Sequence, residues 1–168
     1  MKSSSKLFAN SYLVYALAQG IQFSIEDDIR DSLKGKNISF PSFRLLWILT
    51  FSSHMTMSQL SCLSQTNISN VYRKLTNLKE RGLVDIQSGK NARSKEITIT
   101  KTGRELVHGF IDQQIQDPKL DITKVIDHIP KHELHMFLKV AKFLSDELIG
   151  KPFTEWISSS AKEIHTFD

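Results

Sequence analysis

The sequence predicts a mainly α-helical protein with one small β-hairpin and with further helices at both ends. Apolar residues recur every three or four positions over most of the 168 residues, which is the period of helices with one buried face. Strict alternation of apolar and polar residues is confined to residues 95–100, as expected for a half-buried strand. Turn-forming residues at Gly35, Gly82, 117–118 and 150–152 divide the chain into these segments.

The composition fits a single globular domain over residues 1–168. Hydrophobic residues make up 40% and charged residues 24% of the chain, which excludes the disordered and fibrous classes. No apolar run reaches the roughly 18 residues of a membrane helix, and residues 7–17 lack the cleavage site of a secretory signal. We therefore expect a cytoplasmic protein with no membrane partner. The single cysteine, Cys62, excludes an intramolecular disulfide and a zinc site built from several thiolates.

Two helices are expected in the first third of the chain. The first runs from about Leu7 to Leu33 and ends at Gly35, because its apolar residues are spaced by three or four positions. The second opens at Pro41 and is dense in apolar residues, so we assign Trp47 to the core.

The middle of the chain predicts a helix-turn-helix. A short helix at residues 58–63 points Leu60 and Leu63 inward, and Cys62 is expected to be a buried, inert thiol among them. After a break at residues 64–66, Asn67 is a good N-cap for a second helix that ends at Gly82. The expected buried face of that helix consists of Ile68, Val71, Leu75 and Leu78.

A hairpin and further helices follow. The predicted strands are residues 83–87 and 95–100, joined by a polar and basic loop. Thr100 or Thr102 caps a helix over 101–116, which Asp117-Pro118 breaks. The last third predicts a helix with an apolar stripe and then a short final helix after the break at 150–152. The stripe consists of Leu134, Phe137, Leu138, Ala141, Leu144 and Leu148, and the final helix carries Phe153, Trp156, Ile157 and Ala161.

Positive charge is concentrated in the helix-turn-helix and hairpin. Residues 66–104 carry a net charge of +6, whereas residues 1–65 carry +2 and residues 105–168 carry −4. Such a local field suits a polyanion, since neutralised phosphates release their condensed counterions. Charge alone fits a solvated basic surface equally well.

The second helix of the helix-turn-helix predicts DNA reading in the major groove. With its apolar face buried, its opposite side is polar, free of acids, and bears the Arg, Asn and Ser side chains that pair with base edges. Base contact is expected from Asn67, Ser69, Asn70 and Arg73, and backbone contact from Lys74, at the edge of the face, and Asn77. Tyr72, which flanks the buried stripe, is assigned to packing or to a phosphate contact. In the hairpin, residues 88–95 place Lys90, Arg93 and Lys95 at a tip that can enter the minor groove, and Lys90 also suits a phosphate.

The order of these elements resembles the MarR family of bacterial winged helix-turn-helix transcription regulators. The resemblance is carried by residues 67–84, Asn67-Ile-Ser-Asn-Val-Tyr-Arg-Lys-Leu-Thr-Asn-Leu-Lys-Glu-Arg-Gly-Leu-Val84, and by Ile99-Thr-Lys-Thr-Gly103. Residues 46–48, 79–82 and 151–159 are further similar to the subgroup that represses extracellular protease production and sporulation.

The resemblance implies a homodimeric repressor. Residues 41–103 would form the winged DNA-binding part, and residues 7–34 and 104–168 the dimerisation helices, which agrees with the apolar stripes at both ends. Two half-sites about 34 Å apart would then form a pseudo-palindromic operator. The family's wing usually carries Asp-x-Arg, whereas this chain has Asn91-Ala92-Arg93, so Arg93 lacks an acidic partner; Ser61 stands where Ala is common.

Other functions are less well supported. The sequence contains no nucleophile, phosphate-loop, dinucleotide or metalloprotease motif, so we expect no enzyme activity and no cofactor. A metal site at His128, His132, Glu133 and His135, and a redox switch at Cys62, are weak alternatives. Small-molecule control in the cleft between dimer helices and winged module fits the family, but no residue indicates a ligand. The main alternative is a helical protein-interaction or sensor module with a degenerate DNA-binding face.

Overall fold

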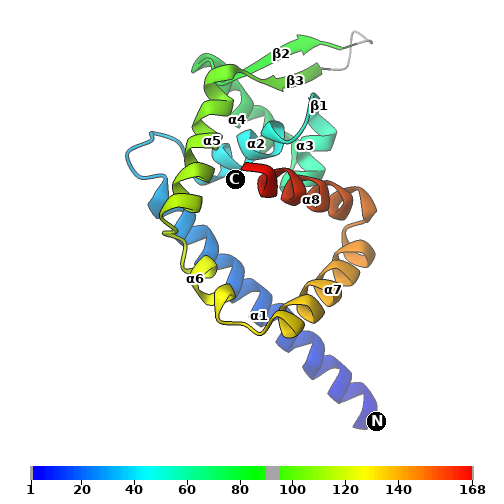
Figure 1. The fold of residues 1–168 in the computed structure, drawn as a ribbon. Coiled ribbons are helices and arrows are strands. Elements are labelled where there is room, and N and C mark those ends of the chain that lie inside the picture. Colours follow the sequence, from blue (N-terminus) through cyan, green and yellow to red (C-terminus); the bar gives the residue numbers. More distant parts are fainter. Residues whose placement is uncertain (1, 90–94, 168) are drawn as a thin grey trace.

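The computed structural model describes residues 2–89 and 95–167. Within these residues the chain forms eight α-helices, one short 3-10 helix and a three-stranded antiparallel sheet (Figure 1). The helices are α1 (Lys2–Ser32), α2 (Phe40–Thr50), α3 (Met57–Ser64), α4 (Ile68–Glu80), α5 (Lys101–Gln116), α6 (Asp121–Asp127), α7 (Lys131–Leu148), α8 (Lys151–Ile164) and the 3-10 helix η1 (His165–Phe167). The strands are β1 (Met55–Thr56), β2 (Val84–Ser88) and β3 (Lys95–Ile99). The predicted mainly helical class with a small hairpin is confirmed.

The core lies between α2 and the elements packed around it. Most of α2 is buried, since its sequence is apolar on nearly every side. Phe43 of α2 lies 4.9 Å from the ring of Phe110 on α5, measured between ring centroids, and Trp47 packs between Phe51 and Phe110. From the other side, α4 contributes Val71, Leu75 and Leu78, all fully buried. This core therefore holds α4 by one face only.

The sheet has the strand order β1-β3-β2. The predicted hairpin is present, with Val84 opposite Ile99 and Ser88 opposite Lys95. The sequence did not predict β1, because a two-residue strand shows no alternation. It pairs with β3 through Met55 and Ile97, both of which are buried.

Side-chain caps start the helices of the winged part. Thr56 and Gln59 form a reciprocal capping box at α3. Asn67 caps α4, and the Thr100 hydroxyl accepts a hydrogen bond from Gly103 N at α5, as predicted. After α4 ends at Glu80, Gly82 turns the chain with a φ of +67°, in the left-handed region that favours glycine.

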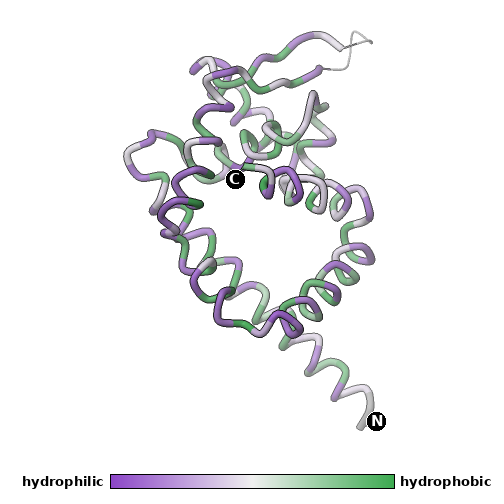
Figure 2. The backbone as a smooth tube through the Cα atoms, in the orientation of Figure 1, coloured by the Kyte–Doolittle hydropathy of each residue, from purple (hydrophilic) through white to green (hydrophobic). Residues whose placement is uncertain are grey.

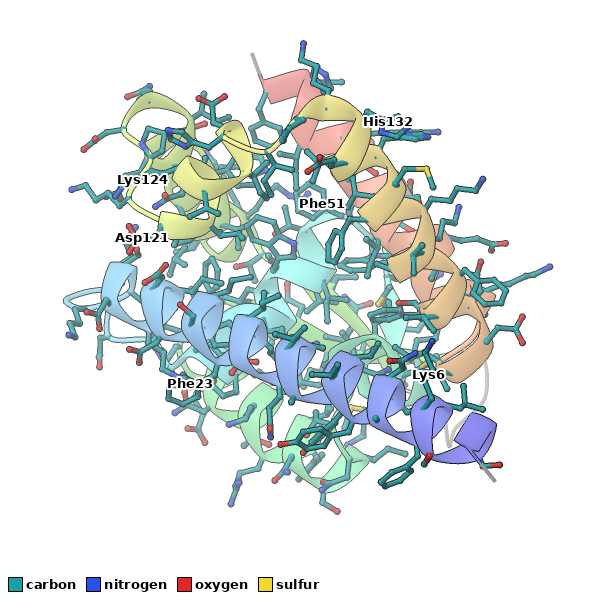
Figure 3. All side chains as sticks on the ribbon, turned by 90° about the horizontal axis from the view of Figure 1, so that it is seen from below. Lys6, Phe23, Phe51, Asp121, Lys124 and His132 are labelled. Atoms are coloured by element: carbon teal, nitrogen blue, oxygen red, sulfur yellow. The ribbon has the colours of Figure 1, made fainter. Side chains whose placement is uncertain are left out.

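The flanking helices meet the winged part at both ends. In Figure 1, α1, α6, α7 and α8 form an open ring below it, and α8 returns to lie beside α2. The Trp156 Nε1–H of α8 donates to the Ser52 hydroxyl over 3.2 Å. The backbone N–H of Asp121 donates to the Asp28 carboxylate of α1 over 3.1 Å, and Figure 3 shows Asp121 and Lys124 on α6 beside that helix. No described helix is long and apolar enough to cross a bilayer.

The structure differs from the sequence-based expectations in helix bounds and in the burial of two side chains. The first helix begins at Lys2 rather than near Leu7, and α6 was not predicted because seven residues are too few for a clear period. Ile68 was expected in the buried face, but it is half exposed because α4 begins there, one turn before the buried residues. Cys62 is exposed, since the inward face of α3 is occupied by Leu60 and Leu63.

Gly103 lies where the start of α5 closely approaches the backbone of Leu83, the residue before β2. A Cβ atom at this position would lie 2.2 Å from the Leu83 carbonyl oxygen, a backbone atom that cannot rotate away. We expect Gly103→Ala to lower the free energy of unfolding by about 1–3 kcal/mol, measured by urea denaturation. The matched control is Gly109→Ala in the same helix, where nothing lies within 4 Å, and it should stabilise by up to about 1 kcal/mol. Equal stability of the two variants would contradict this account.

Candidate nucleic-acid interface

The turn between α3 and α4 is fixed by local hydrogen bonds. Gln65 takes a left-handed conformation with φ of +50°, and its backbone N–H donates to the Cys62 carbonyl. The Ser61 hydroxyl donates to the Thr66 carbonyl over 2.5 Å. Ser61, which stands where alanine is common in similar sequences, thus links α3 by a hydrogen bond to the residue before Asn67. The start of α4 is consequently held in one orientation relative to α3.

The first turn of α4 is anchored by Asn67. Its side-chain Oδ1 accepts a hydrogen bond from the Asn70 N–H over 2.8 Å. This bond satisfies one of the free N–H groups at the helix start and leaves the Asn67 amide NH₂ for another partner. Asn67 therefore serves first as a structural cap.

The outer face of α4 is polar, as predicted. Ser69, Arg73 and Asn77 are exposed and Asn70 is partly exposed. Arg73 Nη2 donates to Asn70 Oδ1 over 3.0 Å, so the guanidinium is held along the outer face of the helix. Because Asn70 Oδ1 has a second lone pair and Arg73 has further N–H groups, the pair keeps free donors and acceptors for base edges.

One acid lies on the same side as these residues, contrary to expectation. The helix extends to the exposed Glu80, seven residues after Arg73 and thus on nearly the same side. It lies two turns beyond Arg73, at the opposite end of α4 from Asn67. The first two turns are free of acids, and they form the part of the face best suited to a polyanion.

Lys74 lies apart from the outer face. It is partly buried and lines a hollow of about 210 Å³ between α1, α2 and the turn before α4. Arg30 and Arg44 line the same hollow, where Glu26 pairs with Arg30 over 2.9 Å. Burial lowers the pKa of the Arg44 guanidinium, and the nearby Glu26 carboxylate opposes that shift. Three cations face one carboxylate here, so the hollow adds positive potential beside α4.

The hairpin joins α4 through Tyr72 and Lys95. Lys95 Nζ lies 5.5 Å from the centre of the exposed Tyr72 ring, within range of a cation–π interaction. This contact supports the packing role predicted for Tyr72, because its ring lies against Lys95 at the loop end of the hairpin strands, and the phosphate contact of its hydroxyl stays a prediction. Spacing alone could not reveal the contact, because it joins two elements. Lys90 and Arg93 lie outside the described residues.

The described residues contain no group of three or more His, Cys, Asp or Glu side chains placed to hold a metal. Of the histidines considered from the sequence, His128 donates from Nδ1 to the Lys124 carbonyl over 2.7 Å. His132 lies at the start of α7, after the Pro130 turn (Figure 3). The histidine cluster therefore supplies no candidate site.

The chain is similar to known proteins in its structure. No family model and no curated protein matches the chain. A MarR protein from Peptoclostridium difficile is 15% identical, with a TM-score of 0.71 over 86% of this chain and 90% of that one. A mutant MarR from E. coli complexed with operator DNA is 16% identical, with a TM-score of 0.69 over 82% of this chain and 97% of that one.

A third solved structure concerns the regulation of DNA binding of BpsR from Bordetella bronchiseptica by 6-hydroxynicotinic acid. It is 16% identical, with a TM-score of 0.63 over 80% of this chain and 99% of that one. Two of these three structures thus concern proteins that bind DNA. At these identities the likeness establishes the fold. The chain has the winged-helix fold of the MarR-family transcription regulators.

Proposed function

We propose that this chain is a dimeric, sequence-specific regulator that binds double-stranded DNA and acts as a repressor. The observation that carries the proposal is the first half of α4, whose outer face is polar, free of acids and bears a pre-oriented arginine. Arg73 is held by Asn70 on a capped helix, which lowers the entropy lost when it binds a base. The fold is shared with a MarR protein that has been solved in complex with operator DNA.

The side chains divide into two kinds of contact. Ser69, Asn70 and Arg73 suit base edges, with the Asn67 amide beside them at the helix start. Asn77 on the outer face and Lys74 beside the positive hollow suit phosphates, which position the protein without reading sequence. At the wing, Lys90, Arg93 and Lys95 keep the predicted role in the minor groove and on phosphates.

The dimer is supported by apolar surface that one chain leaves uncovered. Leu17 on α1 is 64% exposed and Phe137 on α7 is 60% exposed. They belong to runs of exposed apolar residues along both helices, seen as green segments in Figure 2. Phe23, labelled in Figure 3, is a further exposed residue of the α1 run. A soluble monomer rarely exposes so much contiguous apolar surface, so a second copy is the proposed cover.

Three finer assignments stay predictions. The first is the subgroup that represses protease production and sporulation, and the second is a cytoplasmic location of this chain. The third is control by a small molecule in the cleft between the flanking helices and the winged part. A hollow of about 300 Å³ does lie there, between α2, α3 and α8, and Trp47, Trp156 and Arg44 are among its lining residues.

DNA binding is tested by salt dependence and by Arg73→Ala. Duplexes selected from a random pool should bind with an affinity that falls steeply with log salt concentration. Arg73→Ala should weaken binding by about 5- to 150-fold for each half-site of the selected duplex and relax the base preference at one position of each, as measured by fluorescence anisotropy. The control is Lys162→Ala on the distant helix α8, where an exposed cation is removed and affinity should hold. Salt-independent binding with no selected sequence would favour the alternative of an interaction or sensor module.

The Asn70–Arg73 hydrogen bond predicts a coupling between the two residues. In a double-mutant cycle with Asn70→Ala and Arg73→Ala, the DNA affinities should be non-additive by about 0.5–3 kcal/mol. Removing Asn70 frees the guanidinium, so part of the Arg73 contribution is already lost in the single variant. The comparison cycle pairs Arg73→Ala with Asn77→Ala, because within the described residues Asn77 makes no hydrogen bond to Arg73. Additive losses in both cycles would show that Asn70 does not orient Arg73.

The dimer is tested on the exposed stripe of α7. Phe137→Gln should raise the dimer dissociation constant by about 100- to 1000-fold, since symmetry removes one buried aromatic side chain from each copy. Sedimentation equilibrium measures this shift. Lys139→Gln, two residues away on the same helix, should leave the dissociation constant within a few-fold of the unaltered protein. A monomeric unaltered protein, or equal effects of the two variants, would overturn the assignment of this surface.

A further inference from the structure

Ile68 is an apolar side chain that the core does not use. It is the first residue of α4 and is 50% exposed, whereas Val71, Leu75 and Leu78 on the same helix are fully buried. The neighbouring side chains of the first turn, Asn67, Ser69 and Asn70, are polar. Packing therefore does not account for a large aliphatic group at this position.

The position of Ile68 brings it to the leading end of the helix. Side chains in an α-helix tilt toward its N-terminus, so a residue at the first position projects beyond the helix end. Helical geometry places Ile68 on the flank that also carries Tyr72, four residues later and itself half exposed. The Tyr72 ring already contacts Lys95 at the loop end of the hairpin strands. Ile68 thus forms the free, forward end of an apolar flank that runs from the wing to the start of α4.

This flank is separate from the proposed dimer surface. The exposed apolar runs of that surface lie on α1 and α7, at the opposite end of the molecule from the sheet (Figure 1). Around Ile68 the surface is instead polar and basic, with Arg73 on the outer face and Lys95 beyond Tyr72. A partner with negative charge and a small apolar group fits these surroundings better than an apolar protein surface does.

The edges of DNA bases in the major groove offer one apolar group, the C5 methyl of thymine. We infer that Ile68 is a specificity residue that packs against a thymine methyl group in each half-site. The inference rests on the proposed function, because it requires α4 to enter the major groove. A β-branched side chain suits this role, since its χ1 angle is already restricted and little rotamer freedom is lost on contact. Ser69 and Asn70 would read the adjoining base edges by hydrogen bonds.

The expected effect is that of one methyl group removed from water. Losing that contact should weaken binding about fourfold for each half-site, and by about tenfold or more for a duplex with two half-sites. Deoxyuridine removes the C5 methyl while keeping the hydrogen-bonding groups of thymine. It is therefore the probe for this contact.

The experiment replaces each thymine of a selected duplex by deoxyuridine, one symmetric pair at a time, and measures affinity for the unaltered protein and for Ile68→Ala. We expect one thymine pair whose methyl groups matter to the unaltered protein and no longer matter to Ile68→Ala. Ile68→Val, which keeps a branched aliphatic group, should retain part of the discrimination. Val125→Ala, which shortens an equally exposed aliphatic side chain on α6, should retain all of it.

The outcomes separate this inference from the proposed function. If the unaltered protein binds the duplex in a salt-dependent and sequence-specific way but no deoxyuridine pair weakens it, the inference is wrong and the proposed function stands. The same holds if Ile68→Ala keeps the discrimination, or if Ile68→Ala instead dissociates the dimer. If no duplex is bound with salt dependence at all, both fail.

Discussion

The orientation of α4 depends on one packing constraint, the burial of Val71, Leu75 and Leu78 against the core around α2. These residues occupy one side of the helix and are completely excluded from water, so α4 cannot rotate about its axis without exposing them. Their burial decides which side chains face outward, and it does so for the whole helix at once. The polar face with Arg73 is thus a consequence of the apolar face opposite it, and neither exists without the other.

The same constraint extends to the wing through the chain that follows α4. Thr100 closes the connection, because its hydroxyl donates to the Gly82 carbonyl and its N–H donates to the Leu83 carbonyl. Gly103 then allows α5 to lie directly against Leu83. The cation–π contact of Lys95 with Tyr72 adds a second link between hairpin and helix. The described strands of the hairpin are therefore linked to α4 and to its C-terminal end, so that both elements can approach a duplex together in the proposed complex.

Local signals in the sequence were sufficient for the helix-turn-helix, whereas contacts between elements were not predictable. The N-caps at Asn67 and Thr100 and the stop at Gly82 depend on residues within one turn, so the bounds of α4 and α5 follow from the sequence. The exposure of Ile68, by contrast, depends on where the core ends, and the position of Lys74 depends on α1 and α2 lying beside it. A periodic pattern shows which residues share a side but not which neighbour covers them.

Charge and hydropathy place the two proposed contacts at opposite ends of the molecule. The positive segment 66–104 contains α4 and the hairpin, whereas α1 carries a net charge of −1 and α7 a net charge of zero. The proposed dimer surface therefore lacks the positive charge that attracts DNA, and the basic character of α4 disfavours its burial in a protein interface. A second copy can thus cover α1 and α7 while α4 stays free for the duplex. This separation is what would allow a chain of 168 residues to hold both the proposed dimer surface and the proposed reading helix.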